Sequence, residues 1–191
     1  MAQQPNARRP THLNRRKFLI AASTSAVTVS FPHLILANSS ANVTTEKTLS
    51  FVNLHTNETL QCCYWKNNLP ILDELAKVNY ILRDHRTQEV AQIDLRLIDM
   101  LHNLHSLTES TAPFEIISGY RSAKTNESLR KSTSGVAKRS LHMQGKAVDV
   151  RLPDIELKKL RDVAISLQAG GVGYYSKSGF LHLDTGRPRN W

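Results

Sequence analysis

The segment SLHMQGKAVDVRL, residues 140–152, places a histidine and an aspartate seven positions apart with a glycine between them. Residues 147–152 are typical of a β-strand, because valine favours a pleated, half-buried surface. Gly145 predicts a turn that brings His142 back towards Asp149. If Asp149 faced the core, its carboxylate would cost several kcal/mol unless a cation met it. We therefore expect a cation beside this strand.

The segment FLHLD, residues 180–184, repeats the arrangement near the end of the chain. Successive side chains of a strand point to opposite faces, so His182 and Asp184 share one face and the two leucines share the other. The sequence thus predicts a second strand that presents polar groups on one side and packs its apolar side into the core.

His142, Asp149 and His182 together form a possible metal-ligand set of two nitrogens and one oxygen. Catalytic zinc typically has three protein ligands of these kinds and an open fourth position. Zinc in such a site lowers the pKa of bound water to about 7, which allows hydrolysis at neutral pH. The alternative from the residues alone is a buried Asp149 that pairs with Arg121 or Arg151 and binds no metal.

The rest of the chain predicts an α+β fold, with helices packed on a small, mainly antiparallel sheet. Apolar residues at helical spacing predict helices at 69–82 and 94–107. A third predicted helix is opened by Pro153-Asp154, carries its apolar face at 157–167 and is closed by Gly170-Gly171. Alternating and turn-flanked segments predict strands in a hairpin at 49–60 and at 114–117, 147–152, 172–176 and 180–184. A polar stretch at 123–140 carries no predicted helix or strand.

Residues 1–41 are predicted to be a twin-arginine signal segment. The stretch NRRKFLI at 14–20 supplies the arginine pair, and an apolar run at 18–29 follows it. Such a segment directs export to the periplasm or cell envelope. Polar residues interrupt the run, which falls short of the roughly 18 apolar residues that a membrane span needs, so no stable span is expected.

Residues 42–191 are predicted to form a single domain, which this length suits. They carry 20 basic and 16 acidic side chains. No basic run or interleaving with aromatic residues indicates nucleic-acid binding. A modestly basic surface would suit an anionic polymer such as a cell wall. Cys62 and Cys63 are adjacent, which predicts no disulfide framework.

The motif Ser118-Gly119-Tyr120-Arg121, followed by His142, Asp149 and His182, resembles the superfamily of lysostaphin, D-Ala-D-Ala metallopeptidases and hedgehog signalling domains. Within it, the chain is most similar to the murein endopeptidases. The resemblance implies that the two histidines and Asp149 bind one Zn²⁺, and that Arg121 steadies the substrate or the oxyanion. It also implies hydrolysis of cross-links between peptidoglycan stem peptides, joining diaminopimelate residues or D-Ala to diaminopimelate.

The general base of these relatives has no counterpart here. They carry a Glu three residues before the last ligand, or a His two before it, and this chain has Gly179 and Phe180 there. Asp184 is the remaining candidate by facing: it could accept a proton from the attacking water or orient His182. A third possibility is assistance from a tyrosine at 174–175 or from a carboxylate of the substrate.

Three rival functions follow from the same residues. The first is a carboxypeptidase that removes the terminal D-Ala from stem peptides by the same metal chemistry. The second is a non-catalytic, zinc-stabilised domain that binds the cell wall, a reading favoured by the missing base. The third is a structural domain without a metal. Loss of turnover on chelation distinguishes an enzyme from the last two.

Overall fold

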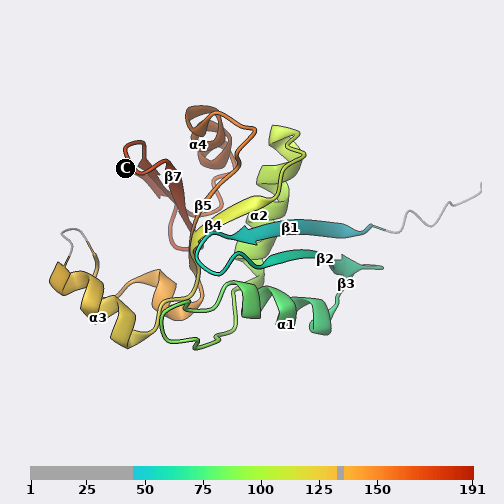
Figure 1. Ribbon diagram of the computed structural model, residues 1–191. Helices are drawn as coiled ribbons and strands as arrows, with labels where there is room; N and C mark the ends of the chain where they lie inside the picture. The colour runs from blue at the N-terminus through green and yellow to red at the C-terminus, as the bar shows by residue number, and fades with distance from the viewer. Residues whose placement is uncertain (1–44, 133–135) are drawn as a thin grey trace, which may run out of the picture. The chain divides into compact units, whose positions relative to one another are not determined.

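The computed structural model describes residues 45–132 and 136–191, drawn in colour in Figure 1. These residues form an eight-stranded sheet with the strand order β3-β2-β1-β4-β5-β7-β6-β8. The strands are β1 Lys47–Asn53, β2 Thr59–Lys66, β3 Leu69–Pro70, β4 Phe114–Ser118, β5 Ala147–Arg151, β6 Gly171–Tyr175, β7 Phe180–Asp184 and β8 Arg189–Asn190. The helices are α1 Leu72–Ile81, α2 Leu95–Thr108, α3 Ala123–Ser132, the short 3₁₀ helix η1 Leu141–Gln144 and α4 Leu157–Ser166.

The predicted α+β class with a mainly antiparallel sheet is confirmed. Only the pairs β1–β4 and β6–β8 run parallel among the strand pairs of the described residues. The predicted signal segment, residues 1–41, lies outside the described residues. Within 45–132 and 136–191, no helix has both the length and the apolar character needed to cross a membrane.

The two faces of the central strands differ as the alternation predicts. Val148 and Val150 on β5, and Leu181 and Leu183 on β7, are fully buried in the core. α2 packs against β1 and α4, and α4 packs against β6 and β7. The opposite face of β5 and β7 is therefore left for polar side chains.

Three of the leucines whose helical spacing predicted the first two helices, Leu69, Leu72 and Leu107, are exposed and do not join the core. Leu69 pairs in β3 rather than joining a helix, so α1 begins at Leu72. Leu72 lies about 120° around α1 from the buried Val78, since successive residues are about 100° apart. Leu107 lies in the last turn of α2, where Thr108 takes the buried position.

Helix α3 was not predicted from the sequence, and neither were the short elements η1 and β8. Helix α3 buries only two polar side chains, Thr125 and Asn126, and no apolar stripe marks it. Its first turn is held by polar contacts: the backbone N–H of Ser122 donates to Asp84, and that of Thr125 donates to the Ser122 hydroxyl. A helix stabilised by a cap has no periodic apolar signal, which is why the pattern failed there.

Candidate metal centre

The three predicted ligands come together on the polar face of the sheet. Asp149 on β5 lies directly opposite His182 on β7 in the antiparallel register. His142 comes from η1, which ends at Gly145 in the left-handed conformation with φ 65°. A Cβ at Gly145 would collide with the carbonyl oxygen of Gln92, so this turn needs glycine. The predicted turn at Gly145 is confirmed.

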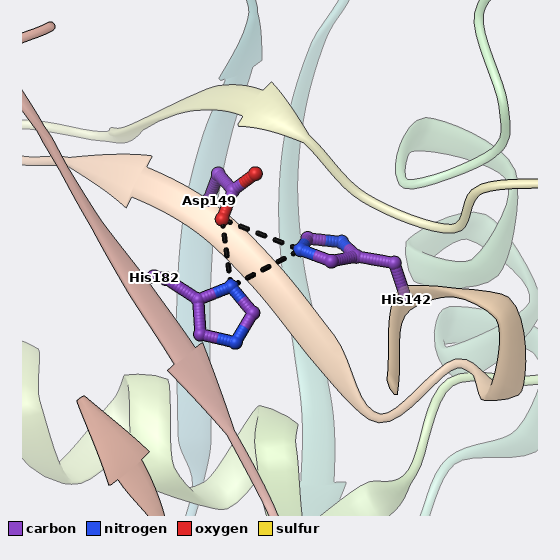
Figure 2. Close-up of side chains that lie close together, drawn as sticks. All are labelled: His142, Asp149 and His182. Carbon is purple, nitrogen blue, oxygen red and sulfur yellow. Dashed lines mark hydrogen bonds and ion pairs between the residues drawn. The ribbon is translucent and has the colours of Figure 1, made fainter. Parts of the chain in front are cut away.

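The ligand atoms converge closely, as the dashed lines in Figure 2 show. Nδ1 of His182 lies 2.9 Å from Oδ1 of Asp149 and 3.1 Å from Nε2 of His142. Nε2 of His142 lies 3.3 Å from the same carboxylate oxygen. One nitrogen or oxygen from each residue is within 4.8 Å of the others.

The other nitrogen of His142 determines which atom faces this cluster. Nδ1 of His142 lies 2.8 Å from the carbonyl oxygen of Gly119. A carbonyl oxygen only accepts, so Nδ1 carries the proton and donates it. In the neutral ring, Nε2 is then a lone-pair donor aimed at Asp149 and His182. This is the usual way in which a second hydrogen bond selects the metal-binding nitrogen.

His182 is oriented in the same way by Asp184. Its Nε2 lies 3.0 Å from Oδ2 of Asp184, on the side of the ring away from Asp149. Burial by itself lowers the pKa of His182, but hydrogen bonds to Asp149 and Asp184 raise it to about 9. Without a metal, the ring is therefore a cation between two carboxylates; a metal ion would take the place of the proton on Nδ1.

These contacts fit a bound cation. In their neutral forms the two histidines each point a lone pair at the Asp149 carboxylate, and three lone-pair donors this close repel one another unless a positive charge lies among them. Burial raises the pKa of Asp149 while contacts with His142 and His182 lower it, and the net shift is downward. With both rings neutral, the set carries the negative charge of Asp149 and faces the pocket, as a catalytic metal site requires.

The two arginines that could have paired with Asp149 behave differently. Arg151 donates to Glu115 on β4. Nη2 of Arg121 lies 3.5 Å from Oδ2 of Asp149, a long contact that leaves Oδ1 to the histidines. Asp149 therefore does form a long ion pair with Arg121, as the alternative hypothesis expects, but this pair does not replace its contacts with the histidines.

Arg121 is held beside the cluster by the loop that follows β4. Its backbone N–H donates to the carbonyl oxygen of His142, and its Nη2 donates to the Ser118 hydroxyl. The buried Nε has no hydrogen-bond partner within 45–132 and 136–191. Burial lowers the pKa of the guanidinium, although Asp149 opposes this shift. Arg121 also lines the pocket over the candidate ligands, where its guanidinium can meet a substrate oxygen.

Asp184 is completely buried and already accepts several hydrogen bonds. Its Oδ1 accepts from the backbone N–H groups of Gly171 and Gly186, and Arg189 donates to both carboxylate oxygens. Together with His182, these donors hold its pKa below the usual value despite burial. Its contacts are those of a group that orients an imidazole.

The structure also shows the residues at the positions where relatives carry the general base, and the two tyrosines considered as alternatives. Gly179 and Phe180, which stand where relatives have an acid or a histidine, offer no titratable group. Tyr174 is covered by Arg161 of α4 at 4.8 Å, on the helix side of the sheet. Tyr175 lines the pocket over the candidate ligands. Of the two tyrosines considered, only Tyr175 faces the site.

The pocket has a volume of about 430 Å³. Its lining also includes large side chains that were not predicted as site residues, among them Arg139, Arg189 and Trp191. Arg189 lies on β8 and Trp191 follows it, and because no strand was predicted there, the sequence alone did not identify either residue.

Comparisons with known proteins agree on one family. A family profile described as peptidoglycan L,D-endopeptidase MepK matches residues 41–191. The chain is 39% identical over 178 residues to peptidoglycan L,D-endopeptidase MepK of Escherichia coli K12, covering 93% of this chain and 97% of the relative. It is 38% identical over 181 residues to a probable MepK of Haemophilus influenzae, covering 93% and 95%. No solved structure matches the chain.

Proposed function

Because the chain belongs to the family of peptidoglycan L,D-endopeptidase MepK, we propose that it is a zinc-dependent murein endopeptidase that hydrolyses peptide cross-links of peptidoglycan. The observation that carries the proposal is the convergence of His142, Asp149 and His182 in one pocket. The L,D specificity in the relatives' names supports bonds between diaminopimelate residues as the substrate. The D-Ala to diaminopimelate bond is the second candidate.

Zinc is the metal that this ligand set fits best. Two imidazoles and one carboxylate, with an open position towards a pocket, match the ligand types and number of catalytic zinc sites. A zinc ion bound there would polarise a peptide carbonyl and activate a water molecule.

The protein residues around the ion have distinct proposed roles. Arg121 lines the pocket beside the candidate ligands, where its guanidinium would stabilise the charge that develops on the substrate carbonyl in the transition state. Gly119 holds the proton on Nδ1 of His142, and Asp184 holds the proton on Nε2 of His182. The remaining candidate to accept the proton of the attacking water is a carboxylate of the substrate, with the Tyr175 hydroxyl assisting through a hydrogen bond.

We also propose that the protein acts in the periplasm after export by the twin-arginine pathway. The arginine pair at 15–16 and the apolar run after it carry this proposal. The alignment with the Escherichia coli relative spans 178 residues, which exceeds the length of residues 42–191. That relative therefore shares part of the amino-terminal segment.

The direct test is to incubate the purified protein with cross-linked peptidoglycan dimers and to identify the products by mass spectrometry. We expect the untreated wild-type protein to convert dimers to monomers, and the masses of the products to identify the bond that is cut. Dimers should stay intact after chelation and with the His182→Ala variant. Release of D-Ala without loss of dimers would instead establish a carboxypeptidase. Intact dimers with the metal still bound would favour a wall-binding domain.

The charge of the domain supports an anionic polymer as the substrate. Of the 20 basic and 16 acidic side chains in residues 42–191, five basic and one acidic lie in 123–139, so the remainder is balanced. Within the described residues this stretch comprises α3 and residues 136–139, and Arg139 lines the pocket. Stem peptides carry free carboxylates, which a positive surface of this kind attracts.

Reversing two of these charges should weaken binding to insoluble peptidoglycan. For Lys124→Glu/Lys138→Glu we expect affinity to fall about tenfold at low salt. The difference should vanish near 1 M salt, where the screening length is about 3 Å. The measurement is a sedimentation assay with chelated protein. Lys158→Glu/Lys159→Glu, with the same charge change on exposed positions of α4, is the control. Equal losses in both variants would rule out a specific role for the 123–139 stretch.

A further inference from the structure

Trp191 is exposed, yet it is held in place by many contacts. Its indole Nε1–H donates to the Tyr175 hydroxyl at 3.3 Å, and the guanidinium of Arg189 lies 4.9 Å from the ring centre. Its backbone bonds to β6 on both sides, donating to Val172 and accepting from Tyr174. Despite these contacts, 52% of the residue is exposed to solvent.

The backbone of β6 is shaped to receive this ring. Gly173 lies beneath the indole, and a Cβ at this position would lie 2.8 Å from the ring carbons. Contacts this short are unfavourable, so any other residue here would push Trp191 away. Gly173 is also directly opposite His182 in the strand register. The glycine thus allows a large aromatic side chain to approach the strand that carries a candidate ligand.

The position of the ring relates it to the metal centre. The centres of the Trp191 and His182 rings are 5.5 Å apart, and Trp191 lines the same pocket as the ligands. Tyr175 and Phe180, stacked at 4.8 Å, line it too. We call these three side chains, Tyr175, Phe180 and Trp191, the aromatic wall. It borders the site on the side of His182.

We propose that Trp191, supported by Gly173, is a substrate-positioning residue whose indole packs against the aliphatic part of a stem-peptide residue next to the scissile bond. An exposed aromatic ring that is already immobilised loses little entropy on binding, and such residues contribute strongly to recognition. Arg121 supplies the polar contact in the same pocket, and the aromatic wall supplies the apolar one. This inference rests on the proposed endopeptidase function.

The test compares the steady-state constants of Trp191→Ala and wild type on cross-linked dimers. We expect KM to rise about tenfold or more, as for a buried aromatic contact, with kcat reduced less. Metal content and melting temperature should stay as in wild type, because neither the ligands nor the core is altered. Trp191→Phe, which retains an aromatic ring, should recover part of the lost affinity.

The matched control is Tyr80→Ala. Tyr80 is 53% exposed and also lies against a guanidinium, that of Arg83 at 4.0 Å, but it lines a different pocket. Its removal should leave KM unchanged. If Trp191→Ala and Tyr80→Ala gave the same KM as wild type, the inference would be overturned.

A double-mutant cycle with Gly173→Ala separates positioning from structure. The added methyl group should displace the indole and raise KM as Trp191→Ala does, and the double variant should be no worse than either single one. Additive effects would mean that Gly173 acts on His182 independently of the ring, which contradicts the proposal. A wild-type protein that leaves dimers intact overturns the endopeptidase function itself, whereas an active wild type with unchanged KM in Trp191→Ala overturns only this inference.

Discussion

Asp149→Asn is expected to abolish tight metal binding and to reduce turnover to background. The substitution keeps the shape of the side chain but removes its negative charge, leaving the lone pairs of His142 and His182 with a neutral amide. Two imidazoles alone do not complete the three-ligand set that catalytic zinc requires. Metal content after dialysis, measured beside turnover of cross-linked dimers, checks both parts of the prediction.

The melting temperature gives an independent readout of the same change. A metal that binds only the folded state stabilises it by about 4 kcal/mol when the free metal concentration is about a thousand times Kd. For a domain of this size that corresponds to a rise of roughly 10 °C. Wild type should show this rise and Asp149→Asn should not.

A suitable control is Glu115→Gln on the neighbouring strand. Glu115 accepts a hydrogen bond from Arg151 and makes no contact with the ligand atoms given above. Its variant should keep the metal-induced rise in melting temperature. If Asp149→Asn showed the full metal-induced rise in melting temperature, Asp149 would not be a metal ligand. The hypothesis in which Asp149 only pairs with Arg121 would then be favoured.

The sequence was sufficient where apolar and polar residues alternate strongly. On β5 and β7 the buried residues Val148, Val150, Leu181 and Leu183 alternate with polar groups, so the facing of the candidate ligands followed from the period of two. The contrast between the faces also made the register costly to shift. This part of the fold needed no information from distant residues.

The sequence was insufficient where contacts join distant segments. The orientation of the His182 ring decides whether Asp184 lies beside the metal or beside the nitrogen on the other side of the ring. Alternation along β7 puts Asp184 on the same face of the sheet in both cases, so it does not distinguish them. Trp191 reaches the pocket only because β8 pairs with β6 across the sheet. No local sequence pattern indicates either arrangement, so both could be seen only in the structure.

Asp184→Asn is the second variant with a large expected effect. The buried carboxylate accepts from Arg189, from two backbone N–H groups and from His182. An amide in its place presents an NH₂ group to donors and weakens the hold on the His182 proton. Substitution of such an orienting partner typically costs about 10- to 100-fold in metal affinity or activity. We expect weaker metal binding, measured by competition with a chelator.

The two roles considered for Asp184 give different kinetics in this variant. If Asp184 orients His182, added metal should restore most of the activity, because the defect lies in occupancy of the site. If Asp184 were the general base, kcat at saturating metal would stay about 10²- to 10⁴-fold low. The contacts of Asp184 favour the first outcome, since its hydrogen bond to His182 lies on the side of the ring away from Asp149. Asp154→Asn, which alters a carboxylate bonded to Ser110 and Thr111, should change neither metal affinity nor kcat.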